Sequence, residues 1–448
     1  MSEGRIAVVG AGIAGLAAAH DLHQAGFSPT VFESRDRVGG RIWTVRKGDF
    51  LMDLGTAVYL GTYKDAIALI HEVGLDEEFV ERAATGAIPR GGKLHYLDYS
   101  RPLRTALGTG VLSPRSKLVA LKLAGTLFRT WRSLGYDTYE RLADIDTATV
   151  REYCRGTLNE ELLQYLGRPL VSGTWVADDE DTSVALMLWT IRNMLVPNVY
   201  NLTTGVAALP DALAAPLDVR LGHAVTNVTD TGTQVEVSHG GGTESFDACV
   251  IATTAGPALE LFPQMDENHR ALYATARYRR LGSICLGLSH RPKDPATYFL
   301  VPPAEDPDTI AVVADHNKSP GRAPDHKGLL TVLLSHEYLE RSEDLDDAQV
   351  LDRAIQSAER YHGPLADAVE EHAVVRWPES VPTIDRGRFK LIAEFTRRRD
   401  PHARVQFASD LDRIPGLNGA LVSGREAAQR VIAAHAKTTP TRLTATPL

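Results

Sequence analysis

The chain has 448 residues, of which 44% are hydrophobic and 23% charged, a composition that excludes a disordered or fibrous protein. At about 100–200 residues per domain, this length predicts two or three domains, each large enough to bury its own core. The formal net charge of −9 argues against a nucleic-acid partner, which needs cations to neutralise phosphates, and favours a small-molecule substrate.

The first predicted elements are a strand, a glycine turn, a helix and a second strand within the first 33 residues. Residues 5–9 form a short apolar run, which the turn Gly10-Ala11-Gly12-Ile13-Ala14-Gly15 interrupts. The apolar spacing that follows predicts a helix ending near Gly26, and strand character returns at residues 30–33. This order predicts a βαβ unit with parallel strands.

Between about residues 90 and 200 the pattern becomes helical and rich in Leu, Arg and Glu. Residues 116–131 mix apolar side chains with cations, which is compatible with peripheral contact to a membrane surface. We favour the alternative, a helix that packs on the core and exposes its basic face. Short strands return over residues 219–252, and residues 436–448, dominated by Thr and Pro, are predicted to be a disordered tail.

The glycine turn suits the binding of a pyrophosphate. Gly10 permits a tight bend, Gly12 lacks the Cβ that would block a phosphate, and Gly15 allows close packing of helix on strand. The helix that begins there offers unpaired N–H groups and a positive dipole end. Glu33 lies 23 residues after Gly10, at the end of the second strand, where a carboxylate accepts hydrogen bonds from a ribose. These features predict a dinucleotide site, without separating NAD from FAD.

A second glycine turn follows the acid in Glu33-Ser34-Arg35-Asp36-Arg37-Val38-Gly39-Gly40-Arg41. Here the sequence resembles the FAD-dependent family that contains protoporphyrinogen oxidases, flavin monoamine oxidases and phytoene desaturases. Met52-Asp53-Leu54-Gly55 is similar to the family's second flavin-contacting segment, and residues 205–213 to the element that re-enters the flavin domain. The resemblance implies that cofactor contacts are made by Ser34, Gly40, Arg41, Gly55 and Thr56, and that the backbone of Val225 contacts the adenine.

Residues 407–410 and 416–428 resemble the closing motif of this family. A helix beginning near Gly419 would direct its positive dipole end at the N1/C2=O edge of the isoalloxazine, where negative charge collects on reduction. The resemblance implies contacts there from Leu417, Asn418 and Ala420, and hydrogen bonds from the ribityl or phosphate region to Asp410. Because residues 376–410 contain no Cys and residues 33–44 no His, the FAD is expected to be bound non-covalently.

The resemblance implies an α/β fold, with a Rossmann-like FAD-binding domain of the glutathione-reductase type and a discontinuous α+β substrate domain. We predict that residues 1–90, 203–265 and 385–435 form the FAD-binding domain. The substrate domain is predicted to comprise residues 91–202 and 266–384.

The resemblance also implies an FAD-dependent oxidoreductase that transfers hydride from carbon of a mostly apolar substrate to flavin N5. A C=C or C=N bond forms, and oxygen is the expected acceptor. Residues 91–96 and 150–175 look most like the protoporphyrinogen oxidase branch, and the lysine of amine oxidases aligns with Leu286. Amine oxidation and a redox-neutral isomerase or cyclase remain alternatives. We assign no catalytic residue, and Trp377 is either a wall of the substrate cavity or a core residue.

The three cysteines, Cys154, Cys249 and Cys285, form no CxxC pair, which favours a reducing compartment. The N-terminus lacks the order of a signal peptide, and no run reaches the roughly 20 apolar residues of a transmembrane segment. We therefore predict a cytoplasmic protein. The 15 histidines show no HExxH and no ligand spacing joined to Cys, so no metal site is predicted. The sequence does not indicate an oligomeric state.

Overall fold

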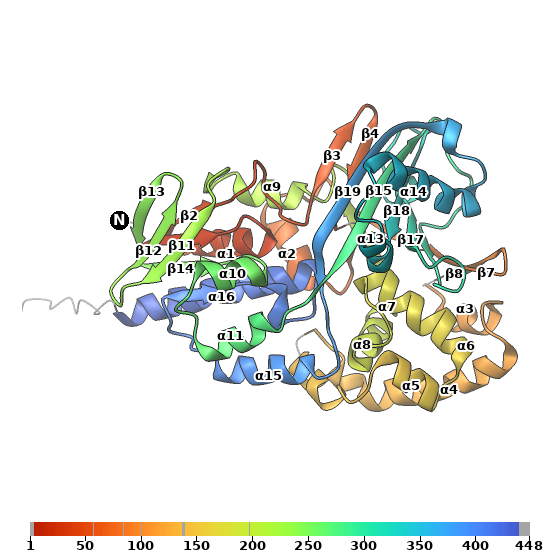
Figure 1. Cartoon of the computed structure of the whole chain (residues 1–448), viewed down its shortest axis with the longest axis horizontal. Coiled ribbons are helices and arrows are strands. Elements are labelled where there is room, and N and C mark those ends of the chain that lie inside the picture. Colours follow the sequence, from red (N-terminus) through yellow and green to blue (C-terminus); the bar gives the residue numbers. More distant parts are fainter. Residues whose placement is uncertain are drawn as a thin grey trace, which may run out of the picture. The chain divides into compact units, whose positions relative to one another are not determined.

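The computed structural model describes residues 4–56, 58–83, 85–98, 100–136, 139–196 and 198–438 (Figure 1). These residues form two compact units. The first contains the described residues of Met1–Gly40, Pro210–Thr275 and Phe395–Leu448, and the second those of Arg41–Leu209 and Ala276–Glu394. The sequence-based division instead places residues 41–90 with the cofactor. Compactness does not test which residues serve a cofactor, so that division stays a prediction.

A parallel sheet of five strands, in the order β10-β2-β1-β14-β20, forms the centre of the first unit. Its strand β1 (Arg5–Val9) and helix α1 (Ile13–Gln24) lead into the parallel strand β2 (Ser28–Phe32), which confirms the predicted βαβ unit. The other elements of this unit are β10 (Asp218–Arg220), β11 (Val225–Asp230), β12 (Val235–His239), β13 (Gly242–Phe246), β14 (Ala248–Ile251), α10 (Ala255–Leu261), α11 (Glu267–Ala274), β20 (Val405–Phe407), η5 (Asp410–Asp412) and α16 (Leu417–Thr438).

Helices α1 and α16 lie side by side on this unit (Figure 1). A Cβ atom on Gly424 of α16 would lie 2.1 Å from the carbonyl oxygen of Ala14, so glycine is what allows the two backbones to approach. Helix α16 continues to Thr438, so the first three residues of the predicted tail, 436–438, are helical. The rest of that prediction, residues 439–448, lies outside the described residues.

A mixed sheet of seven strands, in the order β19-β15-β18-β17-β16-β7-β8, organises the second unit. Its pairs are antiparallel except for β16 with β7. Apolar side chains of β15, β17 and β18 pack against helix α14 in the core. The strands of the unit are β3 (Thr44–Lys47), β4 (Phe50–Asp53), β5 (Tyr59–Leu60), β6 (Phe79–Ala83), β7 (Thr85–Arg90), β8 (Lys93–Asp98), β9 (Asn198–Leu202), β15 (Tyr278–Leu288), β16 (Tyr298–Leu300), β17 (Thr309–Ala314), β18 (Gly328–Leu334) and β19 (Val369–Pro382).

Most helices of the second unit lie between its strands β8 and β9 in the chain. They are α3 (Pro102–Gly108), α4 (Pro114–Thr130), η1 (Trp131–Ser133), η2 (Tyr139–Asp144), α5 (Val150–Thr157), α6 (Glu160–Leu162), the π-helical η3 (Leu163–Gly167), α7 (Arg168–Trp175) and α8 (Val184–Met194). The others are α2 (Lys64–Glu72), α12 (Asp315–Lys318), α13 (His336–Arg341), α14 (Asp347–His362) and η4 (Ala366–Ala368), while α9 (Ala208–Ala214) and α15 (Arg388–Arg398) contain residues of both units. No helix of the described residues is long and apolar enough to cross a bilayer.

Helix α4 forms where a helix is predicted, but the interpretation that its apolar residues pack on the core is wrong. The buried residues of α4 are Ser116 and Leu123, whereas Leu118, Leu121 and Phe128 are exposed. Leu121 and Leu123 are two residues apart and therefore project about 200° from each other around a helix. The apolar residues thus occupy two opposite sides of α4, and the protein covers one of them.

The carboxylate of Glu161 fixes the start of helix α4. It accepts hydrogen bonds from the hydroxyl groups of Ser113, at 2.5 Å, and of Ser116, and Arg90 donates to it at 2.5 Å. Burial raises the pKa of this carboxyl, but the hydrogen bonds from Ser113, Ser116 and Arg90 outweigh it and lower the pKa from 4.5 to about 2. A carboxyl whose pKa falls on folding stabilises the protein above its unfolded pKa and loses this effect as the pH falls toward its folded pKa.

We expect Glu161→Gln to lower the melting temperature at neutral pH, because the amide cannot replace the charged acceptor. The difference from wild type should shrink as the pH falls from about 4.5 toward about 2, where the wild-type carboxylate is also protonated. Thermal unfolding followed by fluorescence across this range measures the difference. Glu160→Gln, which alters an exposed neighbour paired with Arg155, is the control and should change the melting temperature less. A Glu161→Gln deficit that is constant with pH would contradict this assignment.

Candidate functional site

The glycine turn of the first unit combines two close contacts with one open position. Gly10 has φ of +103°, and a Cβ there would lie 2.8 Å from the carbonyl oxygen of Ala252. A Cβ on Gly15 would lie 1.9 Å from the carbonyl oxygen of Gly10. A Cβ on Gly12, in contrast, would meet no atom within 4 Å. Gly10 and Gly15 are therefore required by the fold itself, whereas the space beside Gly12 is available to a ligand.

Helix α1 begins at this open position without a side-chain cap. Gly12 is its N-cap, contributes no side chain, and the first turn contains no acidic residue. The second glycine turn lies against the first, because Gly39 N–H donates to Ala11 O at 2.8 Å. A Cβ on Gly40, where φ is +58°, would lie 3.2 Å from Gly12 Cα. A helix start without a side-chain cap, a positive dipole end and open space fit a pyrophosphate.

Glu33 supports the same turn from the end of β2. One carboxylate oxygen accepts the Ala11 N–H at 2.8 Å, and the other accepts the Arg35 N–H at 2.9 Å and the Ser34 hydroxyl at 3.3 Å. The side chain is buried. Each carboxylate oxygen has two lone pairs, so Glu33 keeps acceptor capacity for a ribose hydroxyl. The structure thus gives Glu33 a role in shaping the turn, beside the ribose contact that stays a prediction.

The start of α16 contains the other predicted cofactor residues of the first unit. Leu417, Asn418 and Ala420 lie in its first turn, are buried, and have no acidic neighbour within that turn. A carboxylate oxygen of Asp410 accepts the Gly416 N–H at 3.4 Å. A Cβ on Gly419 would lie 2.0 Å from Ile414 O, so the turn before the helix packs tightly on it.

Val225 and the remaining predicted residues lie elsewhere in the fold. Val225 begins β11 and pairs with His239 of β12. Arg41, Gly55 and Thr56 belong to the second unit, where the Arg41 carbonyl oxygen accepts the Thr56 N–H at 3.1 Å. A Cβ on Gly55 would lie 2.0 Å from that same oxygen. The Arg41 guanidinium donates to Ser380 O of β19 at 2.8 Å.

Trp377 was expected to be either a wall of the substrate cavity or a core residue. The structure places it in the core of the second unit. Its side chain is buried, and its indole N–H donates to Leu54 O at 2.7 Å. Trp43 packs edge-on against it, with 6.4 Å between the ring centroids. Leu286, at the position of the amine oxidase lysine, is fully buried in β15 and pairs with Leu330 and His372.

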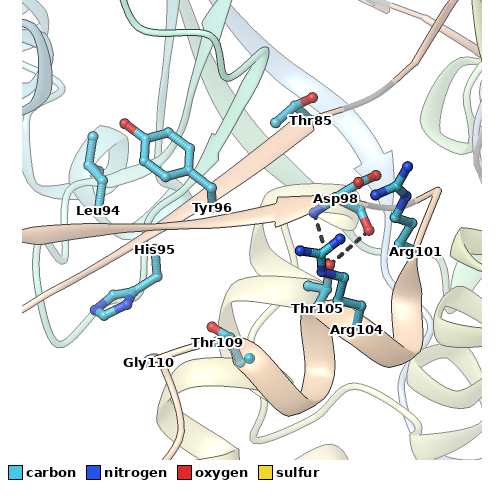
Figure 2. Close-up of a pocket in the computed structure, with 11 residues that line it drawn as sticks. Thr85, Leu94, His95, Tyr96, Asp98, Arg101, Arg104, Thr105, Thr109 and Gly110 are labelled. Carbon is cyan, nitrogen blue, oxygen red and sulfur yellow. Dashed lines mark hydrogen bonds between the residues drawn. The ribbon is translucent and has the colours of Figure 1, made fainter.

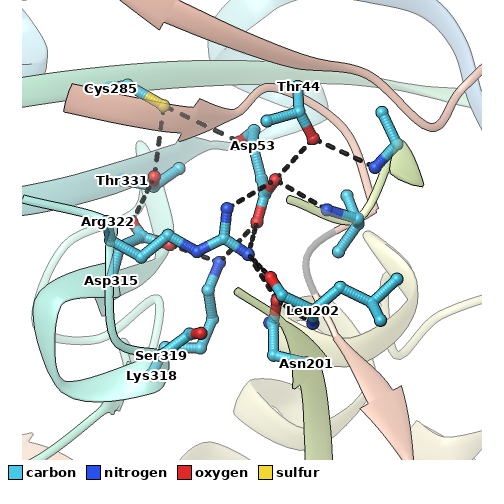
Figure 3. A network of polar contacts seen from close by, with 12 residues as sticks. Thr44, Asp53, Asn201, Leu202, Cys285, Asp315, Lys318, Ser319, Arg322 and Thr331 are labelled. Atoms are coloured by element: carbon cyan, nitrogen blue, oxygen red, sulfur yellow. Dashed lines mark hydrogen bonds and ion pairs between the residues drawn. The ribbon is translucent and has the colours of Figure 1, made fainter. Parts of the chain in front are cut away.

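A buried ionic cluster surrounds Asp53, the last residue of β4 (Figure 3). The carboxylate of Asp53 pairs with Lys318 at 3.1 Å and with Arg322 at 2.9 Å. It also accepts the Thr44 hydroxyl at 2.8 Å and the Val206 N–H at 3.2 Å. Lys318 pairs in addition with Asp315, so two cations and two carboxylates form a neutral group. All four of these charged side chains are fully or almost fully buried.

The charge of Asp53 is maintained by these partners. Burial alone raises the pKa of a carboxyl, but Lys318, Arg322 and Thr44 outweigh it, so the pKa of Asp53 lies below its usual value. The sequence gives no signal for Lys318 and Arg322 as partners. They lie in a polar stretch between two apolar strands, a pattern that favours a solvated loop.

An open cavity of about 470 Å³ lies in the second unit between β8 and α3 (Figure 2). Thr105 ties the two elements together, because its hydroxyl donates to Asp98 O at 2.9 Å and accepts the Asp98 N–H at 3.1 Å. Arg101, Arg104 and Tyr96 line the cavity, and guanidinium groups are suited to carboxylates and phosphates. Among the described residues, no three His, Cys, Asp or Glu side chains are grouped to hold a metal ion.

Comparisons with known proteins match this chain to flavin-containing proteins. A family model for flavin containing amine oxidoreductase matches residues 13–432. Protoporphyrinogen oxidase 2 of Arabidopsis thaliana is 31% identical over 186 residues, 41% of this chain and 35% of that protein. Coproporphyrinogen III oxidase of Bacillus subtilis strain 168 is 23% identical over 439 residues, 88% of this chain and 91% of that protein.

The matches differ in how much of each relative they cover. For the first five curated relatives the matched segment spans from 8% to 51% of the relative, less than two thirds of its length. A crystal structure from Exiguobacterium sp. 255-15, of a protein provisionally named protoporphyrinogen oxidase, has a TM-score of 0.77 at 20% identity. That match covers 98% of this chain and 100% of the other, and it shows a common fold.

Proposed function

This chain belongs to the family of flavin-containing amine oxidoreductases, and we propose that within it the chain oxidises a porphyrinogen-like, mostly apolar substrate. It is an FAD-dependent oxidoreductase with the α/β fold of this family. The net reaction converts H–C–N–H or H–C–C–H and dioxygen into a C=N or C=C bond and hydrogen peroxide. Each turnover thus removes two electrons and two protons from the substrate and adds them to oxygen.

The chain's own residues would hold the cofactor non-covalently. Bound FAD supplies an acceptor for the hydride that leaves carbon. The start of α1, which has no side-chain cap, and the open space at Gly12 suit its pyrophosphate, and Glu33 keeps acceptor capacity for one ribose hydroxyl. The start of α16 offers N–H groups and a positive dipole end beside Asp410. The other residues that we propose as contacts are Gly10, Ala11, Ile13, Ala14, Gly15, Ser34, Gly40, Arg41, Gly55, Thr56, Val225, Leu417, Asn418 and Ala420.

The similarity to coproporphyrinogen III oxidase along almost the whole chain supports a porphyrinogen most strongly, because it covers 88% of this chain. Leu286 argues against amine oxidation. It places an alkyl side chain in the apolar β15, at the position that aligns with the amine oxidase lysine. An uncharged side chain cannot hold a water by a charge-assisted hydrogen bond. Amine oxidation is the second candidate, favoured by the family to which the chain belongs.

Anaerobic mixing of the FAD-loaded protein with candidate substrates tests this proposal. We expect coproporphyrinogen III to bleach the oxidised flavin within a turnover, and simple primary amines or polyamines to leave it oxidised. Admission of oxygen should restore the flavin spectrum and release hydrogen peroxide. Rapid bleaching by amines but not by the porphyrinogen would replace the proposal with amine oxidation. Product formation without consumption of oxygen would replace it with a redox-neutral reaction.

A further inference from the structure

Among the described residues, Val176 is the one residue other than glycine whose backbone has a positive φ. It caps the C-terminus of α7 with φ of 55° and ψ of 26°, a left-handed conformation, and its N–H still donates to Ser172 O at 2.9 Å. Helices usually place glycine or asparagine at such a position, because a Cβ there comes too close to the following carbonyl oxygen. For a β-branched residue this conformation is strained.

The side chain of Val176 lies in an apolar cluster of the second unit. It is 9% exposed and shares this cluster with three buried side chains of the seven-stranded sheet, Leu281, Ile310 and Trp377. Glycine at position 176 would remove the strain, but the cluster would lose one of its members. Strained conformations persist where the surrounding structure requires them, and they are frequent at binding sites. The strained backbone of Val176 thus serves to place an apolar side chain in this cluster.

Trp377 connects the cluster to the segment that follows β4. Its indole N–H donates to Leu54 O at 2.7 Å. A Cβ on Gly55 would lie 3.4 Å from Trp377 Cζ2 and 2.0 Å from Arg41 O. The side of Gly55 that would carry a Cβ is therefore closed by the edge of the indole ring and by the Arg41 carbonyl group. A shift of the ring would change the packing of the Leu54 and Gly55 backbone directly.

We propose that Val176 is a positioning residue for the cofactor. Packed in one cluster with Trp377, it fixes the indole ring, and the ring fixes the backbone of Leu54 and Gly55 against the flavin. This inference rests on the proposed function, in which Gly55 and Thr56 are contacts of FAD. A precise binding site needs supporting residues whose own conformations are fixed. A valine meets this need, because its branched side chain has few rotamers.

The alternative is a purely structural role, in which Val176 contributes only apolar burial. Two smaller residues at this position separate the roles. Glycine removes the strain together with the side chain, whereas alanine removes most of the side chain and keeps the strain. Val176→Gly should therefore melt at a higher temperature than Val176→Ala. In a positioning role both variants lose FAD affinity, whereas in a structural role the affinity follows the stability.

Titration with FAD and hydrogen exchange of the full chain test the proposal. We expect Val176→Gly and Val176→Ala each to weaken FAD binding about tenfold, although their melting temperatures differ. In both variants, amide exchange followed by mass spectrometry should rise about threefold in the peptide that contains residues 53–56, before and after FAD is added. Val171→Ala is the matched control, because Val171 is buried in the same helix and does not belong to the cluster. It should lower the melting temperature and leave FAD affinity and this exchange unchanged.

Trp377→Phe, which removes the indole N–H, tests the path from Val176 to the flavin. Combined with Val176→Gly, it should lose less affinity than the product of the two single losses, because both changes act through one ring. The proposal is overturned if Val176→Gly binds FAD as wild type does, or if Val176→Ala alone loses affinity. Unchanged exchange of residues 53–56 also overturns it. These outcomes leave FAD binding and substrate oxidation by wild type intact, whereas a wild type that binds no FAD would overturn the proposed function and this inference with it.

Discussion

Gly12→Ala is expected to weaken FAD binding by about tenfold or more, equivalent to at least about 1.4 kcal/mol, while leaving the apoprotein folded. A Cβ on Gly12 meets no protein atom within 4 Å and therefore enters the space proposed for the pyrophosphate. The backbone at Gly12 has φ of −72° and ψ of 173°, which alanine adopts without strain. The apoprotein should lose no more than about 1 kcal/mol of stability, because alanine is a less favourable N-cap than glycine but its Cβ meets no protein atom. Titration of the apoprotein with FAD, followed by flavin fluorescence, measures the affinity.

Gly15→Ala separates a cofactor effect from a folding effect in the same turn. Its Cβ would lie 1.9 Å from the Gly10 carbonyl oxygen, so the turn must shift in the apoprotein itself. We expect a loss of about 1–3 kcal/mol of stability from this overpacking, in addition to weaker FAD binding. Gly256→Ala, in helix α10, adds a methyl group where nothing lies within 4 Å and is the neutral control. Unchanged FAD affinity in Gly12→Ala would contradict the proposed position of the pyrophosphate.

The first 33 residues could be interpreted from sequence because their constraints are local. A bend at Gly10, close packing at Gly15 and a terminal acid at Glu33 each demand a particular residue type at a fixed spacing. The structure confirms the strands and the helix that this pattern predicts. The additional role of Glu33, whose carboxylate accepts the Ala11 N–H, was not predicted. This contact forms only because the pairing of β2 with β1 brings Glu33 next to the glycine turn.

The buried side of helix α4 could not be predicted from the sequence. Helical periodicity is a local property and predicted the helix correctly, but which side is covered depends on the neighbouring elements. The anchoring of Ser113 and Ser116 by Glu161, 45 or more residues away, determines that side. The ionic cluster around Asp53 could not be predicted for the same reason, because it also depends on residues that are distant in sequence. Its partners Lys318 and Arg322 are 265 and 269 residues distant in sequence, and only the fold brings them together.

Asp53→Asn is expected to lower the free energy of unfolding by about 3–5 kcal/mol, because it leaves buried cations without their counter-charge. Lys318 and Arg322 are almost completely buried, so water cannot replace the lost carboxylate. Urea denaturation monitored by tryptophan fluorescence measures the loss. Asp49→Asn removes a carboxylate of the same region that pairs with Lys327 while remaining largely exposed, and it should leave the stability close to wild type.

A double-mutant cycle distinguishes a loss of charge balance from a simple loss of hydrogen bonds. Asp53→Asn leaves the cluster with an excess positive charge, and Lys318→Met leaves it with an excess negative charge, whereas the two changes together restore neutrality. The double variant should therefore be more stable than the sum of the single losses predicts, by about 0.5–3 kcal/mol. Strict additivity would show that Asp53 is not coupled to Lys318 and is held by Arg322, Thr44 and the Val206 N–H instead. Because Gly55 lies two residues beyond Asp53, the same variants should also weaken FAD binding if this segment contacts the flavin, a loss that Asp49→Asn should not share.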